Sequence, residues 1–231
     1  MSVAEKFEVI ADEVYNKGIK DAKLTFWNAI TNNGTRANAQ YMFREMDLTG
    51  FEFPKPIKIS GVNSTAQYIF YYYRGEALPR KEDIDLSELR INAGTTTYMF
   101  SDCVNVTNIP DYGLPCAMSH SYSFQRCGQL KRIEAVRCNE YTTFSSSFLG
   151  CSSLEEITFA PYEKDGQTVN SVIGQNISFV DSPNLTLDTL NHIIDCLSET
   201  STAVLTLNEN SKTIIGTEGE ARIRAKGWEM M

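Results

Sequence analysis

Apolar positions recur at a fixed spacing through the middle of the chain. The shared pattern is Phe-x-x-Cys-x-x-(Leu/Val)-x-x-Ile, and it occurs in residues 99–110, 123–134 and 147–158. Its phenylalanines are Phe100, Phe124 and Phe148, which are equally spaced along the chain. A segment this short cannot bury its apolar side alone, so successive copies are expected to stack on one another and form a continuous core.

Weaker copies extend the array on both sides. Residues 179–185 read Phe-x-x-Ser-x-x-Leu, residues 70–73 read Phe-x-x-Tyr, and residues 41–43 are a candidate for a further copy. Within one copy, the Leu-x-x-Ile-x-Phe segment of residues 154–159 predicts a short parallel strand, and the Phe-x-x-Cys segment before it predicts a helical or irregular corner. The 24-residue period lies within the range of about 20–29 residues found in leucine-rich repeats.

The cysteines at the repeat positions predict a buried ladder. Cysteine is a small apolar residue with a weak S–H donor, so it can stack on its copy in the next coil without leaving a strong polar group unpaired. These residues are Cys103, Cys127 and Cys151. Six cysteines in 231 residues are far fewer than a disulfide scaffold carries, so all six thiols are expected to be free.

Both flanks of the array predict caps, because the ends of a repeat array would otherwise expose apolar edges. Apolar residues at helical spacing predict two N-terminal helices, at Val3, Phe7, Ile10 and Val14 and at Leu24, Trp27 and Ile30. At the other end, Thr186 or Asp188 is expected to cap a helix over residues 190–197. A strand in residues 203–207 and a last helix near residues 218–226, ended by Gly227, are expected to follow.

The predicted fold is therefore an α/β repeat protein in one continuous unit. It consists of an α-helical N-terminal cap in residues 1–66, a short leucine-rich-repeat solenoid of parallel β coils in residues 67–185, and a mixed α/β C-terminal cap in residues 186–231. The charge distribution supports this division, because residues 91–161 carry only 10 of the 50 charged residues. The polar residues of this segment are mostly Ser, Thr, Asn and Tyr.

Overall charge narrows the classes of partner. The chain has 29 acidic and 21 basic residues, a net charge of −8 and a pI near 4.9. Nucleic acids and anionic membranes are bound mainly through Lys and Arg, so neither is expected as a partner. No apolar run approaches the roughly 20 residues of a membrane helix, and residues 1–15 are an acidic amphipathic stretch without the apolar region of a signal peptide. The sequence predicts no membrane insertion and no export signal.

Few residues suggest catalytic or metal chemistry. Cys116 and His120 have a metal-like spacing, but no second pair of ligands follows, and structural zinc normally takes four. His192 and Cys196 share a helical face without a partner acid, which favours packing over a nucleophile pair. Asp83 and Asp85 read as a solvated turn. No Gly-x-Ser-x-Gly, phosphate-loop or dinucleotide motif occurs, so the sequence predicts no cofactor, no metal and no enzymatic activity.

The repeat element resembles that of the BspA-like leucine-rich repeat family of bacterial surface proteins, over about residues 97–187. The flanking motifs are similar to those of repeat proteins in phages and prophages of gut bacteria; they are Phe26-Trp27-Asn28, Asn33-Gly34 and Lys226-Gly227-Trp228. The resemblance implies a right-handed solenoid used for binding, as an adhesin or a virion component, with no catalytic residues. The chain has only three good copies, and its missing export signal favours a virion protein assembled in the cytoplasm.

The sequence thus predicts a non-enzymatic recognition module, on a virion or a cell surface, that contacts a host protein or glycan. An intracellular protein–protein scaffold and a carbohydrate-active enzyme with two distant carboxylates remain as alternatives. The oligomeric state stays open. The preferred contact surface is a strand face formed by Thr107, Asn108, Lys131, Arg132, Glu155 and Glu156.

Two further expectations concern these candidate surfaces. Lys131-Arg132 and Glu155-Glu156 occupy the same repeat positions, so they are expected to pair across neighbouring strands about 4.8 Å apart. Tyr71 and Tyr72 form a second candidate surface, since tyrosines offer a large contact area at a low entropy cost. The alternative for this segment is packing, with Tyr73 in the place of the ladder cysteine.

Overall fold

The computed structural model describes residues 43–50, 57–58, 61–62, 66–86, 89–90, 95–199 and 202–231. The helices expected between residues 3 and 30 lie outside the described residues. The strands are β1 (Ile57–Lys58), β2 (Gly61–Val62), β3 (Ile84–Asp85), β4 (Leu89–Arg90), β5 (Asn108–Ile109), β6 (Arg132–Val136), β7 (Glu156–Phe159), β8 (Tyr162–Lys164), β9 (Gln167–Val169), β10 (Ile177–Phe179), β11 (Val204–Leu207) and β12 (Glu229–Met230). The helices are α3 (Leu187–Cys196) and α4 (Glu209–Ala225).

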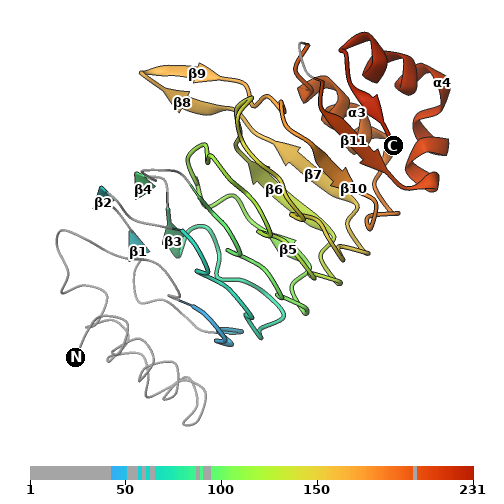
Figure 1. The fold of residues 1–231 in the computed structure, drawn as a ribbon. Coiled ribbons are helices and arrows are strands. Elements are labelled where there is room, and N and C mark those ends of the chain that lie inside the picture. The colour runs from blue at the N-terminus through green and yellow to red at the C-terminus, as the bar shows by residue number, and fades with distance from the viewer. Residues whose placement is uncertain are drawn as a thin grey trace.

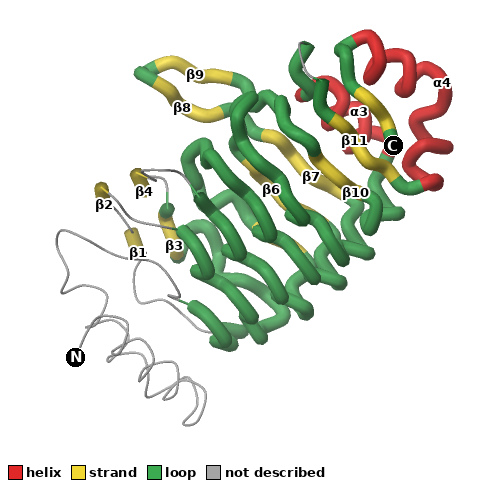
Figure 2. Tube along the Cα trace, in the orientation of Figure 1, coloured by secondary structure: helices red, strands yellow, loops and turns green. Residues whose placement is uncertain are grey.

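Parallel pairing at a regular register organises these strands. In the sheet β5-β6-β7, Asn108 pairs with Arg132 and Arg132 pairs with Glu156, and both steps equal the spacing of the repeated phenylalanines. The sheet β10-β11-β12 and the pairs β1-β3 and β2-β4 are also parallel, whereas β8 and β9 form an antiparallel hairpin. Successive turns of the chain, here called coils, lie side by side from the described residues 43–50 to α3 and α4 (Figures 1 and 2). The assignment of these coils to the leucine-rich-repeat class stays a prediction.

A column of stacked phenylalanine rings forms the centre of the core. Ring centroids in neighbouring coils are 4.6–5.8 Å apart, with interplanar angles from 6° to 24°. The column consists of Phe43, Phe70, Phe100, Phe124, Phe148 and Phe179, all buried. The phenylalanines of the three regular copies and of the two weaker copies, together with Phe43 of the candidate copy, are thus aligned as the sequence predicts. Stacked rings at this separation are stabilised beyond their burial by about 0.5–1.5 kcal/mol per pair.

The cysteine ladder lies beside this column and is hydrogen-bonded from coil to coil. The Sγ atom of Cys127 donates to the carbonyl of Phe100 at 3.0 Å, and that of Cys151 donates to the carbonyl of Phe124 at 3.0 Å. Cys103 donates in the same way to Phe70 at 3.1 Å. The weak S–H donor therefore satisfies a buried carbonyl of the preceding coil, and the predicted buried ladder is confirmed.

All six cysteines are free, as predicted. Burial raises the pKa of the Cys127 and Cys151 thiols, so their reactive thiolate forms are scarce at neutral pH. We therefore expect alkylation to be complete only in denaturant, with Cys103, Cys127 and Cys151 labelled slowest in the native protein. Mass spectrometry after alkylation without reductant measures both properties. A disulfide, or rapid labelling of a ladder cysteine, would contradict the prediction.

The C-terminal unit covers the last coil with helices. Thr186 caps α3, because its side chain accepts from the backbone N–H of Thr189, and the predicted strand at residues 203–207 corresponds to β11. The last helix is longer than the sequence predicts. It begins after the cap Asn208 rather than near residue 218, and a kink at Gly216, where φ is 56° and ψ is −164°, interrupts it. Gly216 and Gly219 have a low intrinsic helix propensity, so the sequence did not predict the first half of this helix.

Candidate recognition surfaces

The strand face predicted as the first contact surface is assembled by β5, β6 and β7. Lys131 Nζ lies 3.5 Å from Glu155 Oε1, and Arg132 Nη1 lies 3.4 Å from Glu156 Oε2. The predicted cross-strand pairing is therefore confirmed. These four side chains are 44–60% exposed, so each pair contributes only about 0.2–1 kcal/mol to stability. Because the opposite charges neutralise each other, the face offers little net field to a charged ligand.

Thr107 and Asn108 lie at the edge of the same face. The carbonyl of Thr107 accepts from the backbone N–H groups of Lys131 and Arg132, and Asn108 Nδ2 donates to Glu134 Oε1 at 3.1 Å. Both residues line a hollow of about 320 Å³. Its charged lining residues are Glu76, Arg80, Lys81, Glu82 and Glu134.

The Tyr71–Tyr72 surface is partly exposed. Tyr72 is 42% exposed and lines a hollow of about 410 Å³, together with Arg74, Asp102 and others. Tyr71 packs edge-on against Tyr72 with ring centroids 4.4 Å apart, and partial burial is the largest cause that raises its pKa to about 12. Tyr73 is buried at the cysteine position, where its hydroxyl accepts from Leu48 N and donates to the carbonyl of Ala77. The packing interpretation therefore holds for Tyr73.

Three tyrosines that the sequence analysis missed form a row across three coils. The rings of Tyr68 and Tyr98 are stacked at 5.2 Å and 7°, and those of Tyr98 and Tyr122 at 4.7 Å and 4°. All three residues are left-handed, with φ between 57° and 60°. The signal was present, because each tyrosine precedes a column phenylalanine by two residues. We call Tyr68, Tyr98 and Tyr122 the tyrosine row.

The left-handed conformation of the tyrosine row carries an energetic cost. A residue with a Cβ atom in this conformation loses about 1–2 kcal/mol relative to the right-handed one. Ring stacking between coils, at about 0.5–1.5 kcal/mol per pair, offsets part of this cost. The backbone also contributes, because the N–H of Tyr122 donates to the carbonyl of Ser145 in the next coil at 2.9 Å.

A row of hydroxyl side chains, Thr95, Ser119 and Thr143, lies three residues before Tyr98, Tyr122 and Ser146 in three successive coils. Thr95 pairs with Ser119 and Ser119 pairs with Thr143 as parallel bridges. Thr143 Oγ1 donates to Ser119 Oγ at 2.9 Å, and Ser119 Oγ donates to Ser121 Oγ at 2.9 Å. The hydroxyls of Thr95 and Thr97 are also in contact.

This hydroxyl row leads into a hollow of about 460 Å³ near the C-terminal unit. The lining residues come from the coil of residues 143–146, from β10 and the segment before it, from β11, and from residue 231. They are Thr143, Phe144, Ser145, Ser146, Gln175, Asn176, Ile177, Ser178, Val204, Thr206 and Met231. None of these side chains carries a charge, in contrast to the hollows beside Asn108 and Tyr72. We call this feature the uncharged hollow.

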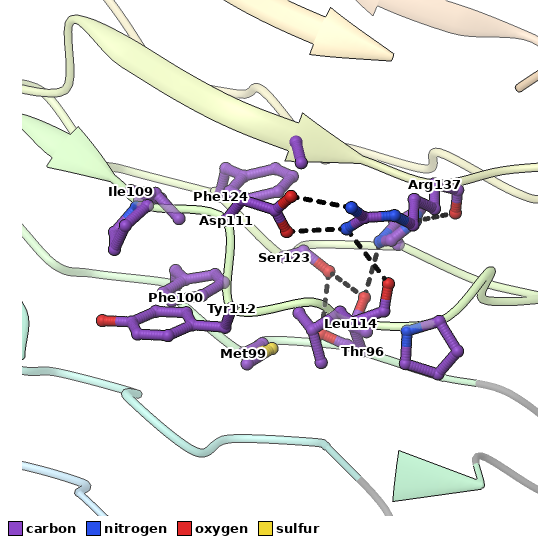
Figure 3. Close-up of a pocket in the computed structure, with 14 residues that line it drawn as sticks. Thr96, Met99, Phe100, Ile109, Asp111, Tyr112, Leu114, Ser123, Phe124 and Arg137 are labelled. Carbon is purple, nitrogen blue, oxygen red and sulfur yellow. Dashed lines mark hydrogen bonds and ion pairs between the residues drawn. The ribbon is translucent and has the colours of Figure 1, made fainter. Parts of the chain in front are cut away.

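A partly buried polar network, with Thr96, His120 and Ser123 at its buried end, lies among the residues drawn in Figure 3. Asp111 and Arg137 form a two-pronged ion pair with both N–O distances at 2.7 Å. His120 Nδ1 lies 2.7 Å from Thr96 Oγ1, and His120 Nε2 lies 3.1 Å from the carbonyl of Arg137. Because a carbonyl only accepts, Nε2 carries the proton and Nδ1 accepts from Thr96. The enclosed space is about 20 Å³, which is room for about one water molecule.

The candidate chemical groups of the sequence are engaged within the protein. Both His120 nitrogens are hydrogen-bonded, so the ring is not free to bind a metal with Cys116. His192 Nε2 accepts from the backbone of Phe159 at 2.9 Å and lies 3.9 Å from Cys196 Sγ, whose pKa burial raises to about 11. Such a thiol is a poor nucleophile, so these contacts favour packing of the pair.

The interpretation of Asp83 as solvated is wrong. Its side chain is buried and forms hydrogen bonds of 2.8 and 3.0 Å with the guanidinium of Arg80, since a buried carboxylate needs a partner. The Asp85 side chain is outside the described part of the structure.

A search for metal sites, membrane-spanning helices and related proteins gives no further indication of function. Within the described ranges, no group of three or more His, Cys, Asp or Glu residues is placed to hold a metal ion. The helices of the same ranges include none with the length and apolar character needed to cross a membrane. Comparison of the chain with family models, with curated proteins and with solved structures finds no match.

Proposed function

We propose that the chain is a non-enzymatic recognition module, built as a short BspA-like leucine-rich-repeat solenoid. The observation that carries the proposal is the regular register of the coils, which places equivalent side chains of successive coils in continuous rows. Rows of this kind provide an extended contact surface for a macromolecule, as repeat proteins generally do. The resemblance of the repeats supports a place on a virion or a cell surface.

The state of the reactive groups supports binding without turnover. The His120 nitrogens, the Asp111 carboxylate and the Asp83 carboxylate each have partners within the protein. A general base or nucleophile needs an accessible lone pair within reach of a substrate.

The test is to measure binding and turnover on the same material. A glycan array and a panel of host cell-envelope fractions report binding, and chromatography of the bound glycans reports hydrolysis. We expect retention of a defined ligand and no products. Specific hydrolysis that a single Asp or Glu substitution abolishes would overturn the proposal in favour of an enzyme.

A further inference from the structure

The uncharged hollow begins where the tyrosine row stops. Tyr98, Tyr122 and Ser146 occupy the same position in three successive coils, because each lies two residues before a column phenylalanine. Their backbones agree, since φ is 57°, 60° and 52°. The first two positions carry stacked rings, whereas Ser146 is small and lines the hollow. The hollow therefore lies beside the position that a fourth ring of the row would occupy.

The chemistry of the lining selects an uncharged, hydroxyl-rich ligand. Phosphate, sulfate and carboxylate groups are bound through Arg, Lys or arrays of N–H donors, and no lining residue has a basic side chain. Hydroxyl and amide groups from Thr143, Ser145 and Asn176 instead offer both donors and acceptors. Neutral sugars present the matching combination, because their hydroxyl groups form hydrogen bonds and their ring C–H faces pack on apolar and aromatic surfaces.

The repetition of the surface favours a polymer over a single sugar. Equivalent residues of neighbouring strands are about 4.8 Å apart, so the hydroxyl row from Thr95 through Ser119 to Thr143 offers similar groups at a constant interval. An extended chain of sugar rings repeats its own groups at a comparable interval. A protein partner has no such regular repeat. About 25% of its residues normally carry a charge, and the hydroxyl row and the uncharged hollow have no charged side chains to pair with them.

We propose that a neutral polysaccharide binds along the hydroxyl row, with one sugar ring seated in the uncharged hollow next to Ser146. This inference rests on the proposed recognition function and names its ligand class and its site. The site differs from both surfaces predicted from the sequence, the charged strand face and the Tyr71–Tyr72 surface. The tyrosine row lies beside the hydroxyl row, and its stacked rings hold the coils of Tyr68, Tyr98 and Tyr122 in register.

The main test substitution is Ser146→Tyr. A tyrosine is accepted in the same left-handed conformation at positions 98 and 122, so the variant is expected to fold while its ring fills the space for the sugar. The matched control is Ser152→Tyr, which adds the same ring at an exposed serine that does not line the hollow. A second variant, Thr206→Val, removes one lining hydroxyl without changing the side-chain shape. Circular dichroism and thermal melts verify folding of all three.

Affinity electrophoresis measures binding to named polymers. The gels contain mannan, dextran or mixed-linkage β-glucan as neutral probes and polygalacturonate as the acidic probe. We expect wild type and Ser152→Tyr to be retarded equally by at least one neutral polymer. Retardation should weaken about tenfold in Ser146→Tyr and severalfold in Thr206→Val, and polygalacturonate should retard none of them.

Each contrary result has a distinct meaning. Retardation by a neutral polymer that Ser146→Tyr leaves unchanged overturns the site but leaves the recognition function standing. Retardation by polygalacturonate that Arg132→Ala abolishes overturns the neutral ligand and supports the charged strand face. If no polymer in the panel retards the wild type, the neutral-polysaccharide proposal fails, and binding to a protein on the envelope panel would preserve the recognition function alone.

Discussion

Replacing Phe124 with alanine is expected to lower the free energy of unfolding by about 3–5 kcal/mol. Phe124 is buried in the middle of the phenylalanine column, with the rings of Phe100 and Phe148 at 5.8 and 5.5 Å. The substitution removes apolar contacts on both faces of the ring and leaves a cavity that stacked coils cannot readily close. Denaturant melts monitored by circular dichroism measure the loss.

Two comparison variants separate the column from general effects of substitution. Phe124→Leu keeps most of the volume and should cost less than about 1.5 kcal/mol. Tyr71→Ala removes a ring that is partly exposed and lies outside the column, so its cost should be clearly smaller than that of Phe124→Ala. Equal losses for Phe124→Ala and Tyr71→Ala would mean that the column does not dominate the stability of the coils.

The features that can be predicted from the sequence are those whose residues recur at the 24-residue spacing of the repeats. Phe100, Phe124 and Phe148 recur at equal intervals, each followed three positions later by a cysteine, and these positions form the core columns. The same register, carried to exposed positions, predicts that Lys131 lies beside Glu155. A period constrains which residues stack because each coil repeats the path of the previous one.

The features that the sequence did not reveal depend on the backbone conformation within each coil. Tyr98 and Tyr122 share the period, but only a backbone with positive φ at these positions stacks their rings at the surface. The uncharged hollow is still harder to predict from the sequence. Its lining combines residues of one coil with Asn176 and Thr206, which are separated from that coil by segments that do not follow the 24-residue period. Irregular spacing removes the register that made the core predictable.

The sequence also did not reveal that His120, a polar residue, is buried among the apolar residues of the coils. His120 follows a run of loop residues and has no counterpart of its own type in the other coils, where Thr96 and Phe144 occupy the equivalent positions. In the structure these neighbours surround it, since Thr96 donates to its ring and the Phe144 ring is stacked on it at 5.5 Å. The histidine is therefore part of the core and is held in its neutral form.

This neutral form makes the stability of the protein sensitive to mild acid. Burial lowers the pKa of His120 from 6.5 to about 4, whereas the unfolded chain keeps the ordinary value. Well above pH 6.5 neither state binds the proton, and stability is at its full value. As the pH falls from 6.5 to about 4, the unfolded state takes up a proton that the native state refuses, so stability decreases by about 1.4 kcal/mol per pH unit, or about 3 kcal/mol in total.

The window of this effect is distinct from that of the ion pairs. The Asp111 carboxyl, whose pKa the Arg137 guanidinium holds below 3.8, loses its contribution only as the pH falls below that value. Denaturant melts between pH 7.5 and 4.5 should therefore show the slope of one proton, and His120→Phe, with Phe144 as precedent for that ring in the next coil, should lack it. The native ring is observed directly by NMR, where its signals should not titrate above about pH 5.5, about 1.5 pH units above its pKa. Protonation of the native His120 ring near pH 6.5 would contradict the assignment of a neutral, buried histidine.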